Sequence, residues 1–247
     1  MSTTLHRTTE RSRPEISADR PGDILTKVLL ACGVAYSGLY VVLNDVIAAT
    51  LYEGYSRTSQ AVSELSATGA PTKGFLTAAL PLSTAVMTAF GVGVWRSARG
   101  KRALRVTGAL LVAHALTFPV WLLAPMTSRE EMVRGTMPAN DVGHIVLTAA
   151  TILFILGEIG FGAAAFGRRF RIYSVATAAA VLIFGALTGV ESAKVPTGDP
   201  TPWMGLFERI SIGAWLLWLA VIAVALLRAR NRTPRAPETP AELVETA

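Results

Sequence analysis

The chain has 247 residues, of which 51% are hydrophobic and only 16% charged, and its formal net charge is +6. A soluble domain carries about 25% charged residues, so this composition argues against a soluble fold. The single cysteine, Cys32, excludes an intrachain disulfide. Nucleic acid is not expected as a partner, because the basic residues form short runs beside apolar segments rather than one basic stripe.

Six apolar segments, separated by polar stretches, dominate the sequence. Such segments are expected to cross a bilayer as helices, because lipid offers no hydrogen-bond partner to an open backbone. The first is too long for the apolar region of a signal peptide and is expected to be retained. We therefore predict an all-α polytopic bundle of six transmembrane helices, at residues 24–51, 75–95, 104–124, 142–166, 174–190 and 205–227.

The basic residues predict the orientation of this bundle. Most of the 23 lysine and arginine residues lie in the N-terminal segment, the second and fourth connections and the C-terminal segment. Six spans place all four on one side, and the positive-inside rule makes that side cytoplasmic. We expect a multi-pass protein of a bacterial inner (cytoplasmic) membrane. Its transmembrane domain would span 24–228, between cytoplasmic tails at 1–23 and 229–247 that are expected to be disordered.

The most polar stretch between two apolar segments is EGYSRTSQAVSEL, at residues 53–65 in the first outer connection. On a helical wheel, Ser59, Ser63 and Glu64 fall on one half and apolar residues on the other, which predicts a short amphipathic helix. Its apolar half would rest on the bundle or on the lipid interface. Its polar half would either face water or cover the outer mouth of the bundle, and periodicity does not separate these alternatives.

Three polar motifs stand beside the predicted spans. They are SQAVSEL at 59–65 followed by Gly-Ala-Pro at 69–71, His144 at the start of the fourth span, and ERI at 208–210 before an apolar run with Trp215 and Trp218. With these motifs the chain resembles, over about residues 24–227, the bacterial and archaeal membrane family catalogued as domain of unknown function 998. The resemblance implies about six spans and these motif positions, and it carries no activity.

Ionisable and polar residues gather at the outer ends of the predicted spans. We expect them to form one outer pocket that binds a ligand, although span ends also tolerate polar residues without any function. Arg209 in particular has a structural alternative, an ion pair with Asp45 or Glu64. No spacing such as HExxH indicates a metal site, and no cofactor is expected. The candidate residues are Asp45, Ser59, Ser63, Glu64, Asp141, His144, Glu191, Glu208 and Arg209.

Two ionisable residues are predicted near the middle of the membrane. His114 on the third span and Glu158 on the fourth lie at similar distances from cytoplasmic arginines, so they share a depth on neighbouring antiparallel helices. A charged carboxylate at this depth is costly and requires a partner or a proton. We expect the two side chains to form a structural hydrogen bond, with a proton relay as the alternative.

Three kinds of function fit these features. We favour a non-enzymatic protein that binds or moves a lipid or small amphiphile at an outer-facing pocket. The second is an interfacial enzyme acting on lipid-linked substrates through Ser63, Glu64 and His144, and we assign no catalytic residue. The third is a subunit that pairs with a second copy or another membrane protein. Gly185 and Gly189 form a GxxxG motif that predicts close helix approach and, if it faces lipid, favours this third reading.

Overall fold

The computed structural model describes residues 21–135 and 139–231, where all regular structure is helical. Six helices in these ranges are long and apolar enough to cross a bilayer, and they coincide with the six predicted spans. The predicted fold class is therefore confirmed, and the protein is a multi-pass membrane protein. The spans are Pro21–Leu51, Lys73–Arg96, Arg102–Leu123, Asp141–Ala164, Arg168–Thr197 and Met204–Asn231.

The spans differ in regularity. The first consists of α1 (Pro21–Val41), a π-helix (Val42–Ala48) and the short α2 (Ala49–Leu51). The others are α3 (Lys73–Arg96), α4 (Arg102–Thr117) with a 3-10 extension (Phe118–Leu123), α6 (Ala139–Ala164), α7 (Arg168–Ser192) and α8 (Met204–Asn231). The connections contain 3-10 helices at Val62–Ser66 and Val195–Thr197 and the short α5 (Arg129–Val133).

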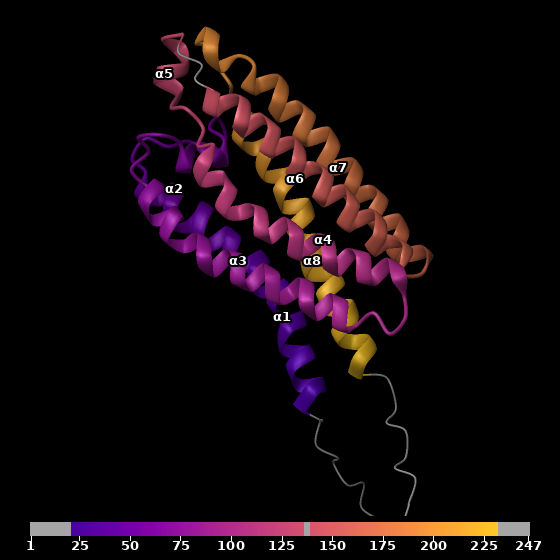
Figure 1. Ribbon diagram of the computed structural model, residues 1–247. Helices are drawn as coiled ribbons and strands as arrows, with labels where there is room; N and C mark the ends of the chain where they lie inside the picture. The colour runs from indigo at the N-terminus through magenta and orange to yellow at the C-terminus, as the bar shows by residue number, and fades with distance from the viewer. Residues whose placement is uncertain (1–20, 136–138, 232–247) are drawn as a thin grey trace, which may run out of the picture.

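The six spans form a closed ring. α1 packs against α3 and α8, α4 packs against α3 and α6, and α7 packs against α6 and α8. The order around the ring follows the chain, because consecutive elements usually become neighbours. Pro21 and Asn231 lie at one end of the ring, which we call the tail end, and α5 lies at the other (Figure 1). We call that other end, with residues 52–72, 124–135 and 193–203, the loop end.

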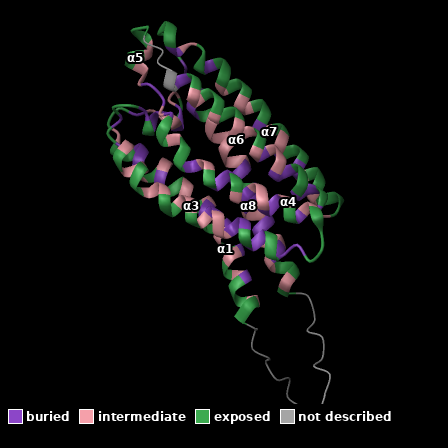
Figure 2. Ribbon diagram, viewed as in Figure 1, coloured by how far each residue is buried: buried purple, intermediate pink, exposed green. Residues whose placement is uncertain are grey.

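The half of the ring nearer the tail end is solidly packed. Phe90, Leu111 and Trp218 are fully buried there, and buried residues follow the inward faces of the helices while exposed ones cover the outside (Figure 2). α3 and α4 approach so closely that a Cβ on Gly108 would lie 2.7 Å from the backbone nitrogen of Trp95. Only glycine fits at that crossing, which closes the ring on this side.

The first loop-end connection differs from the predicted amphipathic helix. Only Val62–Ser66 is helical, as a 3-10 helix, and turns precede it. Polar side chains bond to the backbone here. Gln60 Oε1 accepts from Ser56 N at 2.8 Å, and Glu64 Oε1 accepts from Ala61 N at 2.9 Å. Such local bonds compete with helical ones, so the periodic polar residues stabilise turns instead.

The close helix approach expected at Gly185 and Gly189 is not found. A Cβ on Gly185 would meet Ser211 Oγ at 3.6 Å, and one on Gly189 would meet nothing within 4 Å. Gly185 therefore lies against α8 at an ordinary packing distance, and Gly189 is exposed on the outer face of α7, so the motif does not produce a close crossing of two described helices.

The two tails predicted at 1–23 and 229–247 fall mainly on residues 1–20 and 232–247, which lie outside the described residues. Within the described chain, the first span begins at Pro21 and the last ends at Asn231, slightly beyond the boundaries predicted for the transmembrane domain.

Candidate functional site

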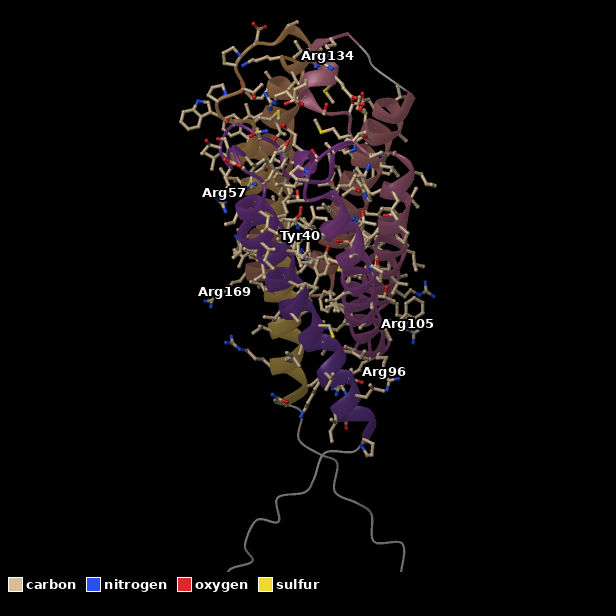
Figure 3. The ribbon with its side chains drawn as sticks, turned by 90° about the vertical axis from the view of Figure 1, so that its left-hand side faces the viewer. Tyr40, Arg57, Arg96, Arg105, Arg134 and Arg169 are labelled. Atoms are coloured by element: carbon tan, nitrogen blue, oxygen red, sulfur yellow. The ribbon has the colours of Figure 1, made fainter. Side chains whose placement is uncertain are left out.

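The ring is hollow in the half nearer the loop end. A cavity of about 390 Å³, which we call the central cavity, is lined by all six spans and is mostly apolar. Tyr40 lines it and lies between the loop-end residues Arg57 and Arg134 and the tail-end residues Arg96 and Arg105 (Figure 3). Apolar side chains that form its wall are Leu43, Leu80, Ile152, Val181 and Ile212.

Three of the predicted outer-pocket residues, Ser63, His144 and Glu208, line the central cavity. Glu208 projects from the first turns of α8, and its carboxylate accepts a hydrogen bond from the backbone N–H of Val62, the first residue of the 3-10 helix. This contact ties the first connection to α8 and brings a carboxylate to the cavity wall.

His144 and Ser63 are each held by a residue near the end of the third span. The Nδ1–H of His144 donates to the carbonyl of Ala124 at 3.2 Å, and the ring packs on Trp121 with centroids 4.9 Å apart. Because a carbonyl only accepts, a neutral His144 has its lone pair on Nε2. Ser63 Oγ donates to Met126 Sδ at 3.3 Å.

Arg209 does not face the cavity as a ligand-binding cation. Its Nε donates to Asp45 Oδ1 at 2.6 Å, so the structural alternative considered above, an ion pair with Asp45, is present in the structure. The same guanidinium donates to the carbonyls of Arg57 and Gly205 at 2.8 and 3.2 Å and to Tyr55 Oη at 2.9 Å. Burial raises the pKa of Tyr55 to about 12, so its hydroxyl stays protonated and Arg209 clamps the connection onto α8.

Glu64 points away from the central cavity. It is 4% exposed, and its two oxygens accept from the Nη2 and Nε of Arg129 at 2.8 and 3.1 Å. Its hydrogen bond to Arg129 raises the pKa of that guanidinium. Arg129 also donates to Thr201 Oγ1 and to the carbonyl of Ser59, at 2.9 and 3.2 Å. Glu64 therefore joins three loop-end connections, beside a smaller polar hollow of about 200 Å³.

The remaining candidates make local contacts and do not enter the central cavity. Asp141 Oδ1 accepts from Thr127 N at 2.9 Å, and Glu191 pairs with Lys194 at 2.5 Å. Within the described chain, the second carboxylate oxygen of each has no hydrogen-bond partner. The backbone carbonyl of Ser59 accepts from Arg129 and Thr201, and Ser59 does not line the central cavity. The nine candidates therefore do not form one pocket.

The structure brings His114 and Glu158 together. His114 is 1% exposed and Glu158 is 0% exposed, with His114 Nδ1 2.9 Å from Glu158 Oε1. The second oxygen, Oε2, accepts from the indole N–H of Trp215 at 2.8 Å. His114 and Trp215 also line the central cavity, at the side facing the tail end.

Sequence reasoning missed several residues that matter here. Arg129, the partner of Glu64, is not among the nine candidates, and the motif that contains Trp215 does not indicate a role for its N–H. Tyr36, Tyr40 and Lys73 line the cavity and are not among the candidates either. Tyr36 and Tyr40, four residues apart on the first span, share a helix face, and that spacing was the available signal.

The set proposed for an enzyme is not assembled as such. Ser63 donates to a methionine sulfur, and the Glu64 carboxylate is neutralised by Arg129 on the far side of the connection. Among the residues that the structure describes, no group of three or more His, Cys, Asp or Glu side chains could hold a metal ion.

A closed ring of six membrane-spanning helices around an apolar cavity defines a class of multi-pass membrane protein. A family model described as "Protein of unknown function (DUF998)" matches residues 32–225. The chain belongs to that family, which confirms the resemblance seen in its motifs. Neither a curated protein nor a solved structure matches the sequence.

The clamp between the first connection and α8 depends on one glycine. A Cβ on Gly205 would lie 2.1 Å from the carbonyl oxygen of Gln60 and 2.5 Å from that of Arg57. Both are backbone atoms, so Gly205→Ala is expected to displace the connection and lower the free energy of unfolding by about 2–3 kcal/mol. Thermal unfolding in detergent measures this. The control is Gly213→Ala, because a Cβ at that position meets nothing within 4 Å. Equal losses of stability in both variants would contradict a close contact between the first connection and α8 at Gly205.

Proposed function

We propose that the central cavity binds a lipid or small amphiphile without chemical conversion. Support comes from one observation above all: an apolar hollow of about 390 Å³ bounded by every span. Ligand pockets of about 300–1,000 Å³ suit small molecules, lined by apolar side chains with few polar groups. The volume suits one chain or a small amphiphile rather than a whole phospholipid.

The distribution of polar side chains supports an amphiphilic ligand. Leu80, Ile152 and Ile212 would pack on its apolar body. Hydrogen-bonding groups stand on either side of this apolar belt, with His144 and Glu208 toward the loop end and His114 toward the tail end. A ligand with polar groups separated by an apolar stretch would satisfy both.

The orientation proposed from the basic residues also indicates in which half of the membrane the cavity would lie. The connections at the tail end contain Arg99, Lys101, Arg102 and Arg168, so the positive-inside rule places that end in the cytoplasm. The loop end, and with it the cavity, would then lie in the outer half of the membrane. The ligand would therefore be taken from the outer leaflet or from outside the cell.

A pair of glycines on α7 provides a matched test. Gly185 lines the central cavity, and Gly189, one turn further on, is exposed outside the ring. Gly185→Leu would fill part of the cavity, whereas Gly189→Leu adds the same side chain to the outer face. Native mass spectrometry of the purified proteins is expected to show a bound amphiphile in the wild type and Gly189→Leu and at least a tenfold lower occupancy in Gly185→Leu. Equal occupancy in both variants would contradict binding in the cavity.

A further inference from the structure

Four aromatic rings line the tail-end side of the central cavity and contact one another in a closed circuit. The ring centroids are 6.0 Å apart for Tyr36 and Phe118, 5.5 Å for Phe118 and His114, 5.3 Å for His114 and Trp215, and 6.1 Å for Trp215 and Tyr36. All four residues line the cavity. We call them the aromatic quartet. Tyr36 and His114 occupy opposite corners, since each contacts Phe118 and Trp215.

His114 lines the cavity, and only its Nδ1 has a hydrogen-bond partner among the described residues. Its Nδ1 is engaged by Glu158, and a net charge at this depth is costly. Two protonation states leave the pair neutral, a carboxylate with an imidazolium and a carboxylic acid with a neutral imidazole. In both states one proton lies between Nδ1 and Oε1, and Nε2 carries a hydrogen. Because Nδ1 is occupied, this Nε2–H is the polar group that His114 contributes to the cavity wall.

Tyr36 supplies a second donor. Its side chain is 3% exposed and lines the cavity. Within residues 21–135 and 139–231, no hydrogen bond joins its hydroxyl to the protein, and the oxygen is not among the fully enclosed unpaired atoms, so it can be reached from the cavity. An acceptor on a ligand in the cavity would give this hydroxyl the hydrogen-bond partner that the protein does not supply.

Flat aromatic walls and two hydrogen-bond donors select a particular chemistry. A planar ring stacks on aromatic faces, and carbonyl oxygens on that ring accept hydrogen bonds without bringing a charge into an apolar site. A saturated acyl chain uses neither feature, and a phosphate or sugar head would leave many polar groups unpaired. The apolar belt above the quartet, formed by residues such as Leu43 and Leu80, suits an alkyl or isoprenoid tail.

We propose that the aromatic quartet binds the ring of a quinone-type amphiphile, with Tyr36 Oη–H and His114 Nε2–H donating to its carbonyl oxygens. This inference rests on the proposed function, since it places the ring of the amphiphile at the tail-end side of the same cavity. It concerns binding alone and includes no electron transfer.

The test is a titration of the full-length protein in detergent with decylubiquinone, followed by native mass spectrometry. Saturable binding to the wild type is expected. Tyr36→Phe keeps the ring and removes one donor, so the Kd is expected to rise about tenfold. Tyr173→Phe is the matched control, because its buried hydroxyl also has no partner among the described residues but Tyr173 does not line the cavity. Its Kd is expected to remain unchanged.

His114 is tested by two changes at its hydrogen bond. Glu158→Gln can still donate to Nδ1 and accept from Trp215, so Nε2–H and quinone binding are expected to be retained. His114→Leu removes the donor and is expected to raise the Kd at least tenfold. If Tyr36→Phe binds decylubiquinone as tightly as the wild type, the inference is overturned.

A second probe separates this inference from the proposed function. Monoolein carries an ester carbonyl and an acyl chain but no ring, and it is expected to bind more weakly and independently of Tyr36. Binding of monoolein that Gly185→Leu removes, with no saturable binding of decylubiquinone, would overturn the quinone inference and leave the proposed function standing. Absence of binding for both probes, with no copurified amphiphile, would overturn both.

Discussion

Arg129→Ala is expected to lower the free energy of unfolding by about 3 kcal/mol, because it leaves the carboxylate of Glu64 without its counter-ion. The Glu64 side chain is 5% exposed, and without Arg129 its oxygens would keep only two neutral donors, the side-chain amide of Gln60 and the backbone N–H of Ala61. Arg129 also donates to Thr201 and to the carbonyl of Ser59. Its removal would therefore separate the three loop-end connections. Thermal and denaturant unfolding in detergent measure the loss.

Two further variants show whether the unpaired charge causes the loss. Glu64→Gln retains a carbonyl oxygen that can accept from Ala61 N and carries no charge, so combining it with Arg129→Ala should recover part of the stability. Arg134→Ala, at an exposed arginine of the same end (Figure 3), should change the stability by less than about 0.5 kcal/mol. If Arg134→Ala lowers the free energy of unfolding as much as Arg129→Ala does, the ion pair between Arg129 and Glu64 is not what stabilises the loop end.

His114→Leu is expected to have the second large effect, a loss of about 3–5 kcal/mol. Glu158 is fully buried, and without His114 it keeps only the N–H of Trp215 as a partner. It would have to take up a proton or remain a charge inside the bilayer. The measurement is the unfolding midpoint in detergent, read alongside the fraction of protein recovered as a monodisperse species.

The charge on Glu158 can be removed separately. Glu158→Gln alone should cost less than about 1.5 kcal/mol, because its amide can donate to His114 and its carbonyl can accept from Trp215. Adding it to His114→Leu should restore part of the lost stability, since no acid then remains buried without a partner. A double variant less stable than His114→Leu would show that the two residues do not act as a pair.

The six spans and the shared level of His114 and Glu158 along their helices could be predicted because they depend on distance along one helix. Hydropathy places each span in the membrane, and the helical rise then gives the depth of each residue. The rise says nothing about which way a side chain points, however. The contact between these two residues also required α4 and α6 to be neighbours in the ring.

The candidate site could be predicted less well from the sequence, because its residues come from different elements. The periodicity of residues 53–65 placed Ser63 and Glu64 on one helical face, but the segment turns to satisfy its own backbone, and the two side chains point to different places. Glu64 pairs with Arg129, which is 65 residues away in the chain. Ser63 donates a hydrogen bond to Met126 beside the cavity. A pattern within one segment of the sequence cannot predict contacts between residues so far apart.

The closed order of the ring and its hollow half were also beyond sequence reasoning. A cavity depends on the side chains that fail to fill a space, here between α1, α6 and α8, and on close crossings elsewhere such as Gly108 against Trp95. The π-helix at Val42–Ala48 turns Asp45 toward Arg209 while Asn44 lines the cavity. Hydropathy does not distinguish it from an α-helix.

The measurement that tests the account most directly is photocrosslinking of a membrane-dissolved amphiphile to the wild-type protein, mapped on α6 by peptide mass spectrometry. This helix has one face in the cavity, with Thr151 and Ile155, and one face outside the ring, with Val146 and Leu153 exposed at 60% and 71%. Binding in the central cavity predicts adducts that concentrate on Thr151 and Ile155 and decrease in Gly185→Leu. Adducts confined to Val146 and Leu153, and unaffected by Gly185→Leu, would contradict it.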